Sequence, residues 1–209
     1  MPLDAAGAVV LLEIRPARRA ADPAPAALEP VFAQARLLLE APGPGSVWSR
    51  AGGAGVSGSL SFGDAGEAFR FLHRLRTEVR SDPARPAVQV VAGLGRGDDV
   101  EAARFASDAF RSLGRKGRIL TRALTPNPDS NTVLGALCRT MDSLVVGWTD
   151  AQWQAIHRRD RGRTLQEIGE ELGIAYQNVS KRLIAAQYAL YREVLEAAGL
   201  VFQRAAPRA

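Results

Sequence analysis

The apolar pattern of this chain differs on the two sides of residue 125, and that difference limits the folds open to it. Before this point short apolar runs, such as 8–14 and 87–92, alternate with amphipathic stretches and with segments rich in glycine and proline. Short apolar runs of this kind indicate buried strands. After residue 130 the apolar residues recur at every third or fourth position, the spacing of an amphipathic helix. The sequence therefore predicts an α+β protein with all of its strands in the first part.

The predicted strands and helices of the first part follow an ordered pattern. We expect strands at 8–14, 47–49, 55–62, 87–92 and 118–124, and helices at 27–40, 64–80 and 99–113. Their order is β-α-β-β-α-β, followed by one further α-β pair. This order is typical of the ferredoxin-like fold, an antiparallel sheet with helices on one face. We therefore predict a ferredoxin-like domain over residues 1–124.

The second part of the chain is predicted to be a separate helical domain. Residues 125–130 include two prolines and favour a linker. Helical periodicity then covers 131–202, and residues 203–209 resemble a flexible tail. Cys138 lies on the apolar stripe of the first helix in this domain, so we expect it in the core.

Composition narrows the chemistry open to the chain. A single cysteine cannot form an internal disulfide, and the N-terminus lacks the features of a signal peptide. No apolar run reaches the roughly 18 residues of a membrane span, so we expect a cytoplasmic protein. Two histidines and one cysteine cannot supply the four ligands of an ordinary zinc site. Residues 93–98 begin like a dinucleotide-binding fingerprint but lack its third glycine, and no Walker A loop occurs, so we expect no cofactor.

Residues 149–187 carry the strongest functional signal. Two capping boxes, Thr149 with Gln152 and Thr164 with Glu167, each predict the start of a helix. Gly173 is then predicted to form a tight turn, and a third helix to begin behind it. Gly169 supplies the small residue that we expect where these two helices cross closely. Two short helices joined by such a turn are typical of a helix-turn-helix, whose second helix lies in the DNA major groove.

The residue types around this turn suit duplex DNA. Glutamine and asparagine form paired hydrogen bonds with adenine, and lysine reaches guanine or phosphate. A run of arginines lies beside the helix that begins after Thr164, where phosphate is favoured. The predicted DNA-binding residues are Arg158, Arg159, Arg161, Arg163, Thr164, Tyr176, Gln177, Asn178, Ser180 and Lys181. The alternative is a plain helical hairpin packed on the first domain, with the arginines in a solvated loop.

Net charge gives this prediction only modest support. The chain carries 27 basic and 22 acidic residues, a net charge of +5. An excess of this size fits a polyanionic partner but does not establish one. DNA affinity would then depend on local clustering of basic side chains rather than on bulk charge.

A second apolar stripe indicates an interface. We expect one long final helix, from about residue 176 to 198, with Ile184, Tyr188, Tyr191 and Leu195 on one side. A surface helix does not leave such a stripe open to water. Either the helix at 130–148 or a second subunit must cover it. We favour a homodimer, because two-fold symmetry presents two reading helices to successive major grooves.

The segment from Trp148 to Leu183, with its two capping boxes and Gly173, resembles the C-terminal helix-turn-helix of SatD-family proteins. It is also similar to the last DNA-reading region of sigma factors. The tail from Ala186 to Tyr191 fits the SatD pattern, as does the order of the N-terminal motifs. The resemblance implies a DNA-binding transcriptional regulator whose N-terminal domain is distantly like the palm-type fold of nucleotide cyclases.

The resemblance also suggests two candidate metal ligands. In palm-type cyclases an acid after the first strand and another at a hairpin Gly-Asp hold two metal ions, and the matching positions are Glu13 and Asp64. Here the first acid is Glu rather than Asp, and the family's motif is reduced to Gly63 and Asp64. We therefore expect a non-catalytic sensor or assembly domain without bound metal, in which Asp64 caps the next helix. The alternative is a nucleotide-acting enzyme with an accessory helix-turn-helix.

Overall fold

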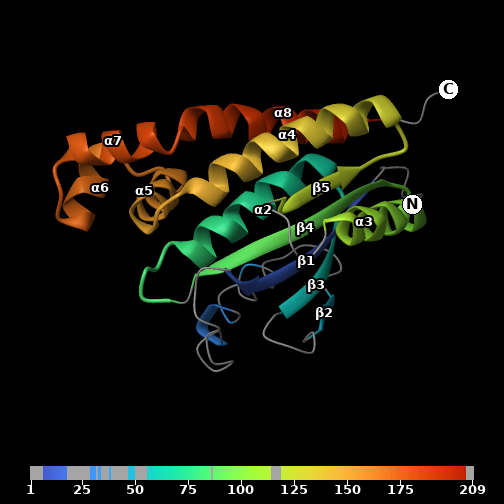
Figure 1. Cartoon of the computed structure of the whole chain (residues 1–209), viewed down its shortest axis with the longest axis horizontal. Coiled ribbons are helices and arrows are strands. Elements are labelled where there is room, and N and C mark those ends of the chain that lie inside the picture. The colour runs from blue at the N-terminus through green and yellow to red at the C-terminus, as the bar shows by residue number, and fades with distance from the viewer. Residues whose placement is uncertain are drawn as a thin grey trace.

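A five-stranded sheet and the helices on its two faces make up the structure (Figure 1), which is a computed structural model. It describes residues 7–17, 29–31, 33, 38, 47–49, 56–85, 87–113 and 119–205. The strands are β1 (Gly7–Pro16), β2 (Val47–Ser49), β3 (Val56–Phe62), β4 (Val88–Gly97) and β5 (Thr121–Leu124). Their order across the sheet is β2-β3-β1-β4-β5. The protein is therefore of the α+β class, as predicted.

The strands pair in both directions. Strand β1 lies antiparallel to β3 and β4, and β2 lies antiparallel to β3. Strand β5 runs parallel to β4. Strand β4 continues five residues beyond the predicted 87–92, because residues 93–97 keep their pairing with β1. Of the helix predicted at 27–40, residues 29–31, 33 and 38 are helical, and the remainder lie outside the described residues.

The helices cover both faces of the sheet, so the prediction that they share one face is wrong. On one face Val10 and Leu12 of β1 pack in the main core with α2 (Ala65–Arg80). On the other face Val9 and Leu11 pack against α3 (Asp99–Ser112). Because β4 and β5 are parallel, the chain between them must cross over a face of the sheet, and α3 is that crossover.

Helix α3 lies directly on the backbone of β4. A Cβ atom at Gly95 would overlap the backbone of Ala102 and Ala106, and one at Gly93 would overlap Phe110. The glycines that resembled the start of a dinucleotide fingerprint therefore make room for a helix.

The helices of the second part share a core with the sheet. Helices α4 (Pro128–Gly147) and α8 (Tyr188–Arg204) lie side by side, and α8 also contacts α2 (Figure 1). One hydrophobic cluster includes Phe69 of α2, Leu134 of α4 and Phe202 of α8. Cys138 belongs to this cluster, as predicted, and burial raises the pKa of its thiol to about 12. Helices on both sides of the predicted linker are thus packed together.

The final helix predicted from residue 176 to 198 is in fact two helices. Helix α7 (Tyr176–Ala185) ends before Gln187, whose φ of 51° lies in the left-handed region, and α8 begins after it. The carbonyl of Ala186 accepts a hydrogen bond from the Trp148 side chain at 2.8 Å. A contact with a residue 38 positions earlier thus stabilises the break. Helix α8 then extends through Gln203 and Arg204, which had been predicted to lie in the tail.

Two of the four predicted dimerisation residues are buried inside the chain itself. Tyr191 is 1% exposed and Leu195 is 5% exposed, because α2 and α4 cover this side of α8. The ring of Tyr191 contacts Trp148 and His73. The prediction that Tyr191 and Leu195 form a subunit interface is therefore wrong. Tyr188 is half-buried, and Ile184 on α7 is exposed.

A buried ion pair joins α2, the sheet and α4. Arg76 of α2 is 3% exposed and Asp142 of α4 is 1% exposed, with 3.5 Å between Arg76 Nη2 and Asp142 Oδ1. Arg76 also donates to the Val90 carbonyl and to the Thr121 hydroxyl, which in turn donates to Asp142. The backbone N–H groups of Leu120 and Thr121 donate to the other carboxylate oxygen. Burial raises the pKa of Asp142, and the charge of Arg76 and these hydrogen bonds oppose that rise.

Replacing Gly95 by alanine should destabilise the protein. The added methyl group must push α3 away from β4, and overpacking of this kind costs about 1–3 kcal/mol. The matched control is Gly135→Ala on α4, where the new methyl group meets only the end of the Arg139 side chain at 3.6 Å. This control should stabilise the protein by about 0.5–1 kcal/mol, as expected within a helix. Urea denaturation of both variants measures the difference, and equal effects would contradict the close approach of α3.

Removing one partner of the buried ion pair should cost more than removing both. Asp142→Ala leaves the Arg76 charge buried without its partner and should lower the free energy of unfolding by about 3–5 kcal/mol. The double variant Arg76→Met with Asp142→Leu removes both charges and should recover much of that loss. Urea denaturation of the two variants is the measurement. A double variant less stable than Asp142→Ala would show that the polar contacts, and not the unpaired charge, decide the result.

Candidate nucleic-acid interface

Helices α5 (Asp150–Asp160), α6 (Leu165–Leu172) and α7 form the end of the molecule that carries the predicted DNA contacts (Figure 1). Ala155, Ile168 and Val179, one from each helix, are fully buried against one another. These three residues form a small core separate from the main one. The three helices are therefore held together by their own packing.

Local sequence signals set the start of two of these helices. Thr149 accepts a hydrogen bond from the Gln152 N–H, and the Gln152 side chain accepts one from the Thr149 N–H. Thr164 and Glu167 form the same reciprocal pair at the start of α6. Both predicted capping boxes are confirmed.

The turn between α6 and α7 also follows the sequence prediction. Gly173 has φ 65° and ψ 33°, a left-handed conformation that glycine adopts without strain. A Cβ atom at Gly169 would lie 2.7 Å from the Ile174 carbonyl oxygen, so a larger residue there would push the turn away. The expected close approach at Gly169 is therefore confirmed.

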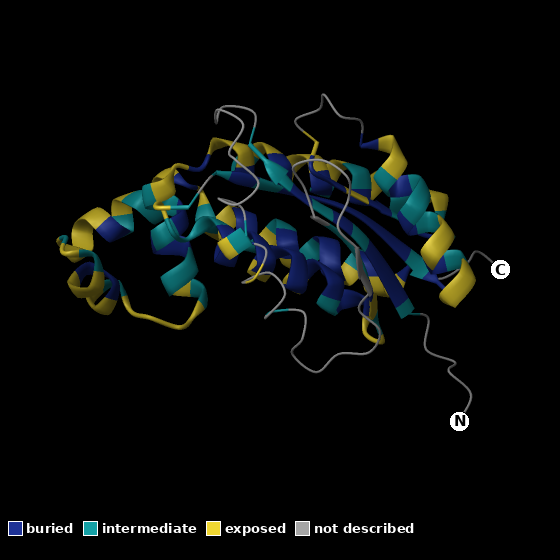
Figure 2. Cartoon of the chain, turned by 90° about the horizontal axis from the view of Figure 1, so that it is seen from below, coloured by how far each residue is buried: buried dark blue, intermediate teal, exposed yellow. Residues whose placement is uncertain are grey.

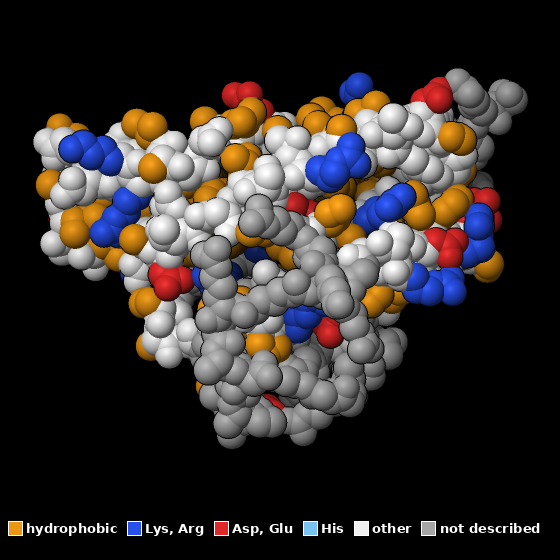
Figure 3. All heavy atoms as spheres, viewed as in Figure 1, with side chains coloured by type: hydrophobic (Ala, Val, Ile, Leu, Met, Phe, Trp, Pro, Cys, Tyr) orange, Lys and Arg blue, Asp and Glu red, His pale blue; other side chains and the backbone are white. Residues whose placement is uncertain are grey.

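Helix α7 offers one face to solvent. Its buried side is Val179, while Tyr176, Gln177, Asn178 and Lys181 are exposed. Ser180 is half-buried. Gln177 and Lys181 are four residues apart, so they lie on the same side of the helix. Figure 2 shows this end of the molecule as largely exposed, and Figure 3 shows basic side chains on it.

The first turn of α7 has no side-chain cap. Its N-cap is Ala175, whose methyl side chain cannot accept a hydrogen bond from the helix. The first N–H groups of a helix carry a partial positive charge and favour an anion. These groups lie beside the exposed side chains of Gln177 and Asn178.

The predicted phosphate-binding arginines are largely occupied within the chain. Arg158 and Arg163 both pair with Glu171, at Nε–oxygen distances of 2.9 and 3.3 Å. Arg161 reaches Glu78 of α2, with 3.2 Å between Nη2 and Oε1. Arg159 is different, because it donates to a backbone carbonyl, that of Arg163, at 2.8 Å. The sequence reasoning missed these acidic partners, and Glu78 lies 83 residues before Arg161, beyond the reach of any local pattern.

Thr164 also has a structural role. Its hydroxyl accepts from the Glu167 N–H and lies 2.9 Å from the Glu167 carboxylate. The capping box therefore uses the groups by which Thr164 had been expected to meet DNA.

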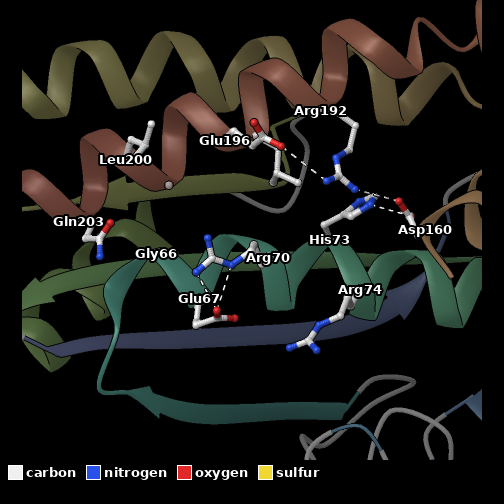
Figure 4. Close-up of a pocket in the computed structure, with 12 residues that line it drawn as sticks. Gly66, Glu67, Arg70, His73, Arg74, Asp160, Arg192, Glu196, Leu200 and Gln203 are labelled. Atoms are coloured by element: carbon white, nitrogen blue, oxygen red, sulfur yellow. Dashed lines mark hydrogen bonds and ion pairs between the residues drawn. The ribbon is translucent and has the colours of Figure 1, made fainter. Parts of the chain in front are cut away.

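A polar cluster fastens the end of α5 to α2 and α8 (Figure 4). The two ring nitrogens of His73 lie 2.8 Å from Asp160 Oδ2 and 3.1 Å from the Tyr191 hydroxyl. Asp160 also accepts hydrogen bonds from the Tyr188 hydroxyl and from Arg192. Burial raises the pKa of Asp160, but the hydrogen bond and charge of His73, with the contacts of Tyr188 and Arg192, outweigh it. The pKa of Asp160 therefore lies below its ordinary value.

A hollow of about 610 Å³ opens beside this cluster, between α2 and α8. Several of its charged groups are paired with one another, as Figure 4 shows for Arg70 with Glu67 and for Arg192 with Asp160 and Glu196. Arg70 lies 2.7 Å from Glu67. The volume is within the ordinary range for ligand pockets. Basic and acidic side chains balance in this hollow, so it favours neither anions nor cations.

The two candidate metal ligands do not come together. Glu13 lies opposite Ser57 in the sheet, whereas Asp64 follows Phe62, which lies opposite Ala8. Ala8 and Glu13 are five positions apart along β1, a span of about 17 Å. Asp64 accepts a hydrogen bond from the Gly66 N–H at 2.8 Å and is the N-cap of α2, as predicted. Within the described ranges no group of three or more His, Cys, Asp or Glu side chains is arranged to hold a metal ion.

Comparison with known proteins finds no matching family model, no curated relative and no solved structure. Among the helices that the structure describes, none combines the length and the apolar character needed to cross a membrane.

Replacing Asp160 by asparagine should destabilise the protein in a pH-dependent way. Hydrogen bonds to charged groups contribute about 1.5–3 kcal/mol each, so we expect a loss of about 1–3 kcal/mol at pH 7. The folded-state pKa of Asp160 is depressed, so its contribution is present above the ordinary value of about 3.9 and is lost as pH falls through the folded value. The difference in free energy of unfolding between wild type and Asp160→Asn should therefore be smaller at pH 3 than at pH 7. Urea denaturation at the two pH values is the measurement.

The matched control is Asp150→Asn. Asp150 pairs with Arg80 at 2.9 Å, but its side chain is mostly exposed. Surface pairs contribute about 0–1 kcal/mol, so this variant should differ little from wild type. If Asp160→Asn unfolded at the same urea concentration as Asp150→Asn at pH 7, the cluster would not fasten α5.

Proposed function

We propose that the chain binds duplex DNA, with α6 and α7 acting as a helix-turn-helix and α7 lying in the major groove. The observation that carries this proposal is the two-sided character of α7. Its inner residue Val179 is buried against α5 and α6, while Gln177, Asn178 and Lys181 are exposed beside an uncapped N-terminus. Those are side chains that read base edges, on the element that enters the groove in such motifs.

The paired arginines change how the phosphate contacts are assigned. Arg158, Arg161 and Arg163 each meet an acid of the same chain, and DNA would have to compete with that acid. Arg159 donates to a backbone carbonyl, a neutral partner that phosphate replaces at lower cost. We therefore assign the main phosphate contact of this loop to Arg159, together with the N–H groups at the start of α7.

The first part of the chain is proposed to act as a non-catalytic sensor or assembly domain. The order β2-β3-β1-β4, with α2 between β3 and β4, supports a ferredoxin-like or palm-type relationship, to which α3 and β5 are added. A transcriptional regulator of the SatD type is the proposal that joins this domain to a DNA-reading end. The proposed homodimer needs a surface other than Tyr191 and Leu195, and solution mass tests it.

Substitutions on α7 and at Arg159 should distinguish contacts that select a DNA sequence from contacts that strengthen binding to any duplex. The preferred site is first selected from a pool of random duplexes with the full chain. Gln177→Ala or Lys181→Ala should then cost about 1–3 kcal/mol at the preferred site and much less on unrelated duplexes. Arg159→Ala should weaken binding to all duplexes alike and reduce the slope of log affinity against log salt by about 1. Competition binding at several salt concentrations measures all three variants.

Two control variants remove the same charge elsewhere. Arg161→Ala removes an arginine that already pairs with Glu78, so we expect a smaller loss than for Arg159→Ala. Arg111→Ala removes an exposed arginine of α3, on the far face of the sheet, and should leave DNA binding unchanged. Wild-type protein that binds no duplex at low salt would overturn the proposed function.

A further inference from the structure

Ile184 is an exposed aliphatic side chain on the outer side of α7. It is 72% exposed, whereas the other members of its predicted stripe are half-buried or buried. The break at Gln187 separates α7 from α8, so Ile184 does not continue the buried stripe of α8. The packing of the chain therefore gives no reason for a large apolar residue at this position.

The position of Ile184 on α7 offers a reason for an apolar side chain there. Counted from Gln177, the outward residues Ser180, Lys181 and Ile184 follow at three, four and seven positions, so all four lie on one face. Helices in the major groove read bases through side chains at this same spacing. Three of the four side chains are polar hydrogen-bonding groups, and Ile184 alone is apolar. The apolar feature of the major groove is the C5-methyl group of thymine.

We propose that Ile184 contacts the C5-methyl group of a thymine in the major groove and so selects an A·T pair. This inference rests on the proposed function. Seven residues of α-helix rise about 10.5 Å, which corresponds to about three base steps of 3.4 Å. The selected thymine thus lies about three base pairs from the pair that Gln177 contacts. The contact gives Ile184 a partner of matching chemistry that the chain itself does not supply.

Deoxyuridine provides the test, because it differs from thymidine only by the absent methyl group. In the selected duplex each thymine is replaced in turn, and the affinity of the full chain is measured by competition. One replacement should weaken wild-type binding about fourfold, the value for losing one buried methyl group. With Ile184→Ala the same replacement should change affinity by less than about twofold, within the error of additivity. Ile184→Val keeps a branched apolar side chain and should retain the sensitivity.

The control variant is Leu190→Ala, which removes an exposed apolar side chain from α8, outside the reading face. It should keep the full response to deoxyuridine. A site that requires no thymine, or equal deoxyuridine effects in wild type and Ile184→Ala, would overturn the inference while leaving DNA binding intact. A fall in solution mass with Ile184→Ala and an unchanged deoxyuridine response would instead assign Ile184 to a protein interface. The absence of all duplex binding would overturn both proposals.

Discussion

The ion pair between Arg76 and Asp142 is the constraint on which the arrangement of the layers depends. A buried charge is tolerated only with a partner and with its remaining hydrogen-bonding groups satisfied. Through its Nη2 atom Arg76 contacts groups from β4, β5 and α4, although its buried Nε has no hydrogen-bond partner among the described residues, and Asp142 accepts hydrogen bonds from the start of β5. Helix α4 must therefore sit over β5, and α2 beside it. The apolar side chains around the pair then supply most of the favourable free energy, and the pair fixes which elements meet.

Helix α2 also contacts α5, which belongs to the proposed DNA-reading end of the molecule. Its residues His73, Glu78 and Arg80 meet Asp160, Arg161 and Asp150 of α5 and its C-cap. These contacts span nearly the whole length of α5, so the direction of α5 is tied to α2 and through it to the sheet. Since α6 and α7 pack on α5, the exposed face of α7 has a defined orientation relative to the first part of the chain. In the proposed function, α2 therefore connects the sheet to the end that contacts DNA.

The sequence predicted best what is decided by neighbouring residues. The capping boxes, the left-handed Gly173 and the close approach at Gly169 follow from residue type and short spacing, and all are present. The break at Gln187 escaped prediction because it depends on Trp148, far earlier in the chain. Tyr191 and Leu195 are covered by α2 and by α4, the helix that the sequence left open as the alternative to a second subunit. Periodicity shows that a stripe is covered but not by what, so it could not decide between the two. Gly93 and Gly95 stood out in the sequence as the start of a dinucleotide fingerprint. Only the position of α3 shows that they make room for a helix against β4.

The distribution of charge at the proposed reading end favours selectivity over strength of binding. Phosphate contacts supply affinity that is independent of sequence. Here Arg158 and Arg163 form ion pairs with Glu171, and Arg161 forms one with Glu78, so phosphate would have to displace these acids. By contrast, no acidic side chain of the described residues pairs with Lys181, and Gln177, Lys181 and Ile184 are exposed on α7. Under the proposed function, we therefore expect weak binding to unrelated duplexes, with the contacts of α7 making up a larger share of the total binding free energy. In this proposal, discrimination between sites depends mainly on Gln177, Lys181 and Ile184.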